Sequence, residues 1–375
     1  NADRFTVLLA KSTHHFKMEI LSEIVSLGTE FEYKDFIPAG YYWTPNTYET
    51  NFSFYGYLKK KFKSYDLLGS FRIGHIIIDP KPNYESYANL EVNEIIKRNF
   101  SYISSSIGFE KKSNKWTYNG WLIQTMRPPK IEELYSDGPH LGTYAYEIGE
   151  PNLDLEKIYG AESIITYNSK PFNIKLTSFL NYSPYYYQMT KMGECEEEMV
   201  AVYDEEDNKW RYPCSGPEHP YIEWGSGPGW LYMYDTKGVE ALIAGYEFSL
   251  HYIKNRLSVD YDFSYVVGEN LSVNEPLSYM NPSKHILNIG YDQNLMNYKL
   301  RLTKVNSQNR LGEFESYTPG AYLMDFIISY KNKRQTLTLQ LNNILNETHY
   351  NHLSKIKFIA PEPGTNVVLS YKLLF

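Results

Sequence analysis

Apolar and polar residues alternate along the last segment of the chain. The apolar set is Val367, Leu369, Tyr371, Leu373 and Phe375. The positions between them include Asn366, Ser370 and Lys372. Because successive side chains of a strand point to opposite faces, this period of two predicts a strand with one apolar and one polar face.

The same period recurs at 337–342, 257–267 and 247–252, and in the second of these segments the polar positions include Asp260 and Asp262. Two carboxylates would be costly in a dry core unless each were paired, and a water-facing surface removes that cost. Counting such segments gives about fourteen complete strands and a partial one at 4–12. The pattern predicts an all-β fold, an antiparallel transmembrane β-barrel with water inside.

Short and long connections alternate along the chain. Tight polar turns are predicted near 63–65, 111–114, 169–171, 254–255, 294–297 and 331–333. Connections of about a dozen residues or more are predicted around 35–47, 79–93, 128–155, 189–237, 269–281, 306–319 and 346–364. Short turns at one rim and long loops at the other are typical of outer-membrane barrels. This alternation places residue 375 at the short-turn rim and puts His14 and His15 at a turn on the same side.

Composition removes several other classes of protein. The 375 residues are 42% apolar, 22% charged and 16% aromatic with a net charge of −7, which excludes collagen-like and disordered chains. No apolar run approaches the roughly 18 residues of a membrane-spanning helix. Mild acidity without a Lys/Arg cluster argues against a nucleic-acid partner. Residue 1 is Asn and 4–10 already reads as a strand, so we expect the sequence to begin within a longer protein.

Two groups of motifs resemble a known family. The first group is Arg127-Pro128-Pro129, the run ELYSDGPH at 133–140, the run YEIGEPNL at 146–153, and Glu156. The second group is NILN at 343–346, YNHLS at 350–354, PEPG at 361–364 and the terminal Phe375. Together they resemble the barrel of TonB-dependent outer-membrane receptors, and the motifs with the strands between them cover nearly all of the chain.

The resemblance implies a barrel of about 22 strands closed by an N-terminal plug. Residues 1–375 would be one partial barrel domain with about 14 to 15 of these strands, without the plug and the first strands. The implied function is import of a scarce ligand, such as zinc or an iron siderophore, into a Gram-negative bacterium. The implied partners are outer-membrane lipid, TonB acting through the plug, and the barrel assembly machinery, for which Phe375 would be the signal.

The connection at 189–237 is strongly acidic and carries Glu194 and Glu196 among its carboxylates. One interpretation is an extracellular lid whose negative field attracts a cation, a metal chelate or a basic ligand. The other is a solvated acidic loop, which is what most charge runs are.

Cys195 and Cys214 are the two cysteines of the chain, and both fall in this loop. An outward-facing loop lies in an oxidising compartment, which favours a disulfide between them. The alternative is a soft metal site made by both thiolates with His219, although two cysteines without a CxxC spacing are a weak signal for one.

Four histidines map to long loops: His140, His219, His349 and His352. They could meet over the barrel mouth as zinc ligands with Asp137 or a lid carboxylate, because imidazole and carboxylate suit Zn²⁺. Each histidine alone is more often an ordinary surface or loop-packing residue. The metal would be cargo, and no tightly bound cofactor is expected.

The tyrosines at 182 and 185–187 lie near a predicted strand end, where an aromatic girdle is the favoured interpretation. The sequence has no GxSxG, HExxH, P-loop or dinucleotide motif, so a transporter is favoured over an enzyme. The alternatives are an ungated porin, which would share the barrel, and an outer-membrane hydrolase, which would need a nucleophile and a base at the rim.

Overall fold

The computed structural model describes residues 4–20, 23–39, 44–82, 89–140, 145–191, 202–204, 209–211, 221–223, 230–313 and 315–374. Almost all regular structure there is strand, with one short helix, α1 (Ile131–Tyr135), and one 3-10 turn at Val92–Glu94. The described helices are too short and too polar to cross a bilayer.

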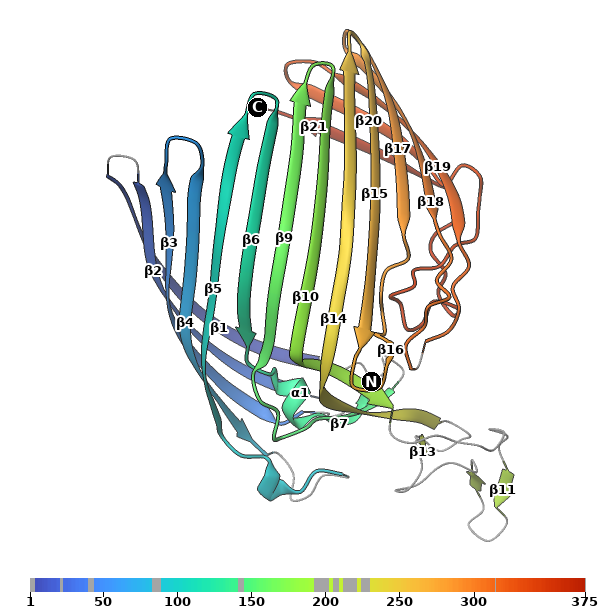
Figure 1. Cartoon of the computed structure of the whole chain (residues 1–375). Coiled ribbons are helices and arrows are strands. Elements are labelled where there is room, and N and C mark those ends of the chain that lie inside the picture. The colour runs from blue at the N-terminus through green and yellow to red at the C-terminus, as the bar shows by residue number, and fades with distance from the viewer. Residues whose placement is uncertain are drawn as a thin grey trace.

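The long strands pair antiparallel, each with the next along the chain. In the described part of the protein they are β1 (Arg4–Ile20), β2 (Glu23–Ala39), β3 (Asn46–Lys61), β4 (Asp66–Lys81), β5 (Arg98–Ser113), β6 (Trp116–Arg127), β9 (Glu156–Ser169), β10 (Phe172–Lys191), β14 (Trp230–Lys254), β15 (Leu257–Asn270), β17 (Lys284–Gln293), β18 (Met296–Val305), β19 (Ala321–Lys331), β20 (Gln335–Asn342) and β21 (Asn366–Leu373). Figure 1 shows that these fifteen strands form one curved wall.

The connections are sorted between the two ends of the wall, as the sequence predicts. Short turns such as 114–115, 170–171 and 294–295 lie at the end where the chain reaches its C-terminus (Figure 1). The long connections and α1 lie at the opposite end. The predicted position of His14 and His15 is wrong, because β1 continues without a break to Ile20 and both histidines lie within the strand.

The two faces of the wall differ in polarity. Leu122 and Leu180 are 63% and 49% exposed on the outer face. On the inner face, Ser249 Oγ donates to Asp262 Oδ1 at 2.7 Å and Arg301 Nε donates to Asn288 Oδ1 at 3.0 Å. The alternation predicted for 257–267 is therefore confirmed, with the aspartates on the polar side.

Ion pairs join the strands β1 to β4 on their inner face. Glu30 lies 3.2 Å from Lys11 and 3.3 Å from Arg72, and Lys34 lies 3.0 Å from Glu49. Such charges are compatible with a water-filled interior and would be costly against lipid.

The wall has two edges. Among the described residues β1 pairs with β2 alone, and β21 pairs with β20 alone. The antiparallel barrel wall and the number of strands confirm the predicted fold class, whereas the total of about 22 strands in a closed barrel stays a prediction.

Candidate functional site

The connection between β6 and β9 folds inward and narrows the long-loop end of the wall. Ile131, Leu134 and Tyr135 of α1 are each fully buried. They pack in one apolar cluster with Phe100 of β5 and Tyr187 of β10, among others. The aromatic girdle predicted for 185–187 is therefore wrong for Tyr187, because this ring supports α1.

We call α1 the wedge, and the long-loop end of the wall the mouth. Arg127 anchors the wedge to the wall. Its two terminal nitrogens donate to the Glu133 carboxylate at 2.9 and 3.0 Å, and its Nε donates to Glu156 Oε2 at 2.7 Å. The guanidinium also lies 4.5 Å from the ring centroid of Tyr187. A bidentate pair of this kind fixes orientation as well as distance. The Arg-Pro-Pro and Glu-Leu-Tyr motifs thus have a structural role at the mouth.

Asp137 follows α1 and is 6% exposed. Its carboxylate accepts hydrogen bonds from the backbone N–H groups of Asn89 and Leu90 at 2.7 and 2.8 Å, from the Asn89 amide at 2.8 Å and from the Tyr146 hydroxyl at 2.9 Å. The predicted ligand residue is thus engaged by protein donors and holds the 89–90 segment to the wedge.

A small hairpin continues from the wedge across the mouth. Its strands are β7 (Asp137–His140) and β8 (Ala145–Ile148), and β8 pairs in parallel with the start of β14, placing Glu147 beside Tyr234. His140 Nδ1 lies 3.0 Å from Glu147 Oε1. The mouth therefore carries an imidazole and a carboxylate in contact.

A second cluster joins three long connections, and Glu315 is its centre. The Glu315 carboxylate is 2% exposed and accepts from the backbone N–H groups of Tyr279 at 2.6 Å and Gly312 at 2.9 Å. His352 Nε2 lies 2.9 Å from its Oε1. Tyr279 has a φ of 60°, a left-handed conformation that costs about 1–3 kcal/mol for a bulky residue. The bond to Glu315 helps hold it there.

The other side of His352 is also occupied. Its Nδ1 lies 2.8 Å from Thr318 Oγ1, which in turn accepts from Lys357 Nζ at 2.8 Å. Burial lowers the pKa of His352 below its usual value, opposed by the Glu315 carboxylate and assisted by the Lys357 ammonium. The imidazole thus has one nitrogen hydrogen-bonded to Thr318, and its other nitrogen lies close to the Glu315 carboxylate but without the geometry of a hydrogen bond.

The predicted site residues fall into three groups. Asp137 and His352 are buried in the networks above, and His140 contacts Glu147. His349 is half-buried, with Nδ1 3.4 Å from the Glu347 carbonyl oxygen. Glu194, Cys195, Glu196, Cys214, His219 and Phe375 lie outside the described residues. In the part of the chain that is described, no three His, Cys, Asp or Glu side chains are arranged to hold a metal ion. Any shared zinc site would therefore need ligands from outside that part.

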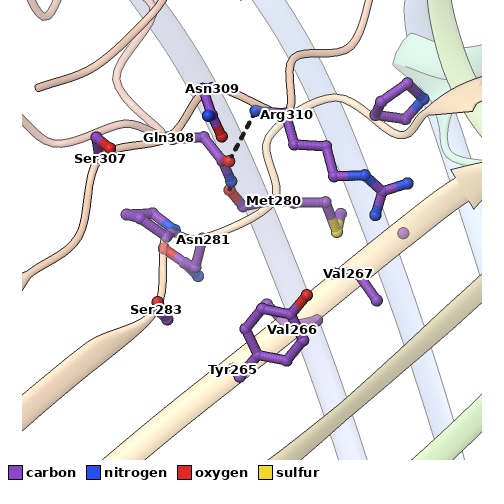
Figure 2. Close-up of a pocket in the computed structure, with 13 residues that line it drawn as sticks. Tyr265, Val266, Val267, Met280, Asn281, Ser283, Ser307, Gln308, Asn309 and Arg310 are labelled. Carbon is purple, nitrogen blue, oxygen red and sulfur yellow. Dashed lines mark hydrogen bonds between the residues drawn. The ribbon is translucent and has the colours of Figure 1, made fainter.

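Sequence reasoning missed Glu315 and Lys355, because nothing in the local pattern distinguishes them from solvent-exposed loop charges. It also missed a pocket of about 230 Å³ where β15 runs beyond the start of β17 (Figure 2). Tyr265, Met280, Asn281 and Arg310 are among its lining residues. The Arg310 N–H donates to Gln308 Oε1 at 3.2 Å, which ties down one side of the pocket (Figure 2).

Solved structures with the same architecture identify the fold. A scan of the sequence against models of known protein families finds no match. Copper transporter OprC superposes with a TM-score of 0.79 at 14% identity, over 99% of this chain and 57% of that one. The FrpB iron transporter from Neisseria meningitidis gives 0.69 at 12%, over 98% and 55%.

The Serratia marcescens hemophore receptor HasR, solved with its hemophore HasA and heme, gives a TM-score of 0.68 at 13% identity, over 100% of this chain and 59% of that one. The chain has the same fold as these three neighbours, which confirms the predicted barrel wall, and it spans 55–59% of their length.

Replacing Gly149 by Ala should loosen the wedge. A Cβ there would lie 2.4 Å from backbone atoms of Leu134 and Tyr135, which cannot rotate away. We expect a loss of about 1–3 kcal/mol in the free energy of unfolding, measured by denaturant titration. Gly69→Ala is the matched control, because its Cβ would meet only the Ser106 carbonyl, at 3.8 Å. Equal losses for both variants would contradict the role of the wedge.

The Glu315 cluster should loosen in acid. Because the pKa of His352 is lowered in the folded protein, the folded protein binds fewer protons than the unfolded chain at mildly acidic pH. The stability that neutral His352 contributes is therefore present above a pH of about 6.5 and is lost as the pH falls through the pKa of the folded state. Hydrogen exchange at 312–320 and 350–358, corrected for the intrinsic effect of pH, should therefore accelerate in acid. His352→Gln keeps one donor and one acceptor without a titrating group and should remove this dependence. If His352→Gln kept the full pH dependence of hydrogen exchange, groups other than His352 would be its cause.

Proposed function

We propose that this chain is part of an outer-membrane receptor that imports a metal ion or a metal chelate. The observation that carries the proposal is a wall with an apolar outer face and a charged inner face, narrowed at one end by α1 and the β7–β8 hairpin. A wall of this kind suits lipid outside and water inside. A folded mouth suits capture of a ligand better than free diffusion. Likeness to transporters of copper and iron and to a heme-related receptor supports the cargo class.

The rest of the machinery is proposed on the same grounds. The 1–375 segment would be a barrel domain whose free edges β1 and β21 are paired in the complete protein, since an open edge in lipid leaves backbone groups without partners. A plug filling the lumen, TonB acting through it, and the assembly machinery reading Phe375 complete the proposal, and the role is transport rather than catalysis.

Several charged residues at the mouth are the proposed first contacts for a cationic cargo. His140 with Glu147 is a described pair whose nitrogen and oxygen donors suit zinc, copper or iron. Glu194, Glu196 and His219 would add to it from the acidic lid, and a bond between Cys195 and Cys214 would limit the lid's motion. The metal is cargo in this proposal and not a resident cofactor.

Deletion of the gene in the bacterium that carries it tests the proposal. We expect uptake of one among copper, zinc, ferric chelates and heme to fall severalfold at limiting supply, measured as cell-associated metal, and to return when the gene is restored. Uptake should also require TonB. Unchanged uptake of all four, or entry of unrelated small solutes independent of TonB, would refute the receptor and indicate a pore.

A charge on the outer face should be far more damaging than a charge on the inner face. Leu176 is 39% exposed on the outer face of β10, and Thr177 is the next residue, on the inner face. We expect Leu176→Arg to destabilise the protein in lipid vesicles by about 2–4 kcal/mol if it lies near the bilayer midplane, and Thr177→Arg to have little effect. The measurement is denaturant unfolding of the full-length protein in vesicles. A larger loss of stability for Thr177→Arg than for Leu176→Arg would contradict the assignment of the Leu176 face to lipid.

A further inference from the structure

One lysine of the final long connection reaches into the mouth. Lys355 Nζ lies 5.8 Å from the ring centroid of Tyr234 and 5.6 Å from that of Tyr279. Both distances are within the range at which a ring attracts a cation. Tyr234 comes from β14 and Tyr279 from the connection before β17, so three segments distant in the sequence meet at one ammonium group.

A carboxylate completes this arrangement. Glu147 is 8% exposed and is paired in register with Tyr234 through the β8–β14 ladder. Its charge acts to raise the pKa of Lys355, against the effect of burial, and adds to the effect of burial in raising the pKa of Tyr279. Proteins bind organic ammonium groups between aromatic rings, and a nearby carboxylate adds an opposite charge. We call Tyr234, Tyr279 and Glu147 the ammonium cage.

The cage is built by the rest of the mouth and not by Lys355. Glu147 is placed by the β7–β8 hairpin, which follows the α1 wedge. Tyr279 is held at a φ of 60° by its N–H bond to the buried Glu315 carboxylate. Because a separate buried group holds this strained residue in place, the position of the Tyr279 ring does not depend on Lys355.

Lys355 lies on a segment anchored on both sides. Two residues later Lys357 Nζ donates to the Ser316 carbonyl at 2.7 Å, and three residues earlier His352 contacts Glu315. Lys355 is half-buried, and burial lowers the pKa of its ammonium while the Glu147 carboxylate opposes that shift. The side chain therefore gives up part of its hydration to lie beside the two rings.

We propose that the cage is a binding site for an alkylammonium group, with Lys355 as its internal occupant. A ligand bearing such a group would compete with Lys355 and displace its side chain from the cage. A free amine and a chelate that bears an amine both present this alkylammonium group, so the proposal includes both as ligands. The inference concerns binding by the purified protein and does not depend on which cargo is transported.

Titration of the purified full-length protein with n-butylammonium, which has the head group of lysine, tests the proposal by calorimetry. In the wild type, Lys355 competes at an effective concentration in the millimolar range, so binding should be weak. Lys355→Ala removes the competitor, and we expect binding at least about tenfold tighter. Lys333→Ala, in a turn at the opposite rim, is the matched control and should bind as weakly as the wild type.

Two double variants test the cage itself. Glu147→Gln and Tyr234→Leu, each combined with Lys355→Ala, should lose the gained affinity, while thermal unfolding shows that they remain folded. Absence of tighter binding in Lys355→Ala, or equally tight binding after either second change, would overturn the proposal and leave Lys355 as a structural tie. A metal-uptake defect without butylammonium binding would uphold the receptor and refute the cage.

Discussion

The hydrogen-bonded ladder between neighbouring strands is the interaction on which the rest of this structure depends. Each strand from β1 to β21 in the wall satisfies its backbone through the next, so the wall needs neither a dry core nor a helix to hold it. Side chains are thereby free to differ on the two faces, apolar outward and polar inward, as Leu176 and Thr177 do on β10. Register alone decides which residue faces which medium.

The ladder also explains why the candidate site residues lie at one end of the wall. Short turns close the wall at one rim, whereas the long connections at the other rim have room to fold inward. The α1 wedge enters because Arg127 binds Glu133 and Glu156 together, and it brings the β7–β8 hairpin with it. Glu315 performs a similar task for the later connections. The mouth is therefore made by two anchored clusters, one based on β6 and β9 and one on the 279–357 connections.

The clusters are polar yet buried, a combination that is stable only when every partner is present. Asp137 accepts four hydrogen bonds, and Glu315 accepts two from backbone N–H groups and contacts His352. Residues that look like metal ligands in a list of polar side chains are thus committed to holding loops together. The mouth residues that we propose for ligands are therefore others: His140, Glu147 and the two tyrosines of the cage.

Much of the fold could be read from the sequence because strand periodicity and connection length are local properties. The alternation around Asp260 and Asp262 already required a wet face, and the spacing of turns sorted the connections between the rims. The place of His14 and His15 was predicted wrongly, because the first strand was expected to end near residue 12, whereas β1 continues to Ile20. The roles of Tyr187, His352 and Lys355 were decided by tertiary structure alone, because each depends on groups that lie 31 to 208 positions away in the chain and meet only when the wall curves: Glu156 for Tyr187, Glu315 for His352, and Glu147 for Lys355.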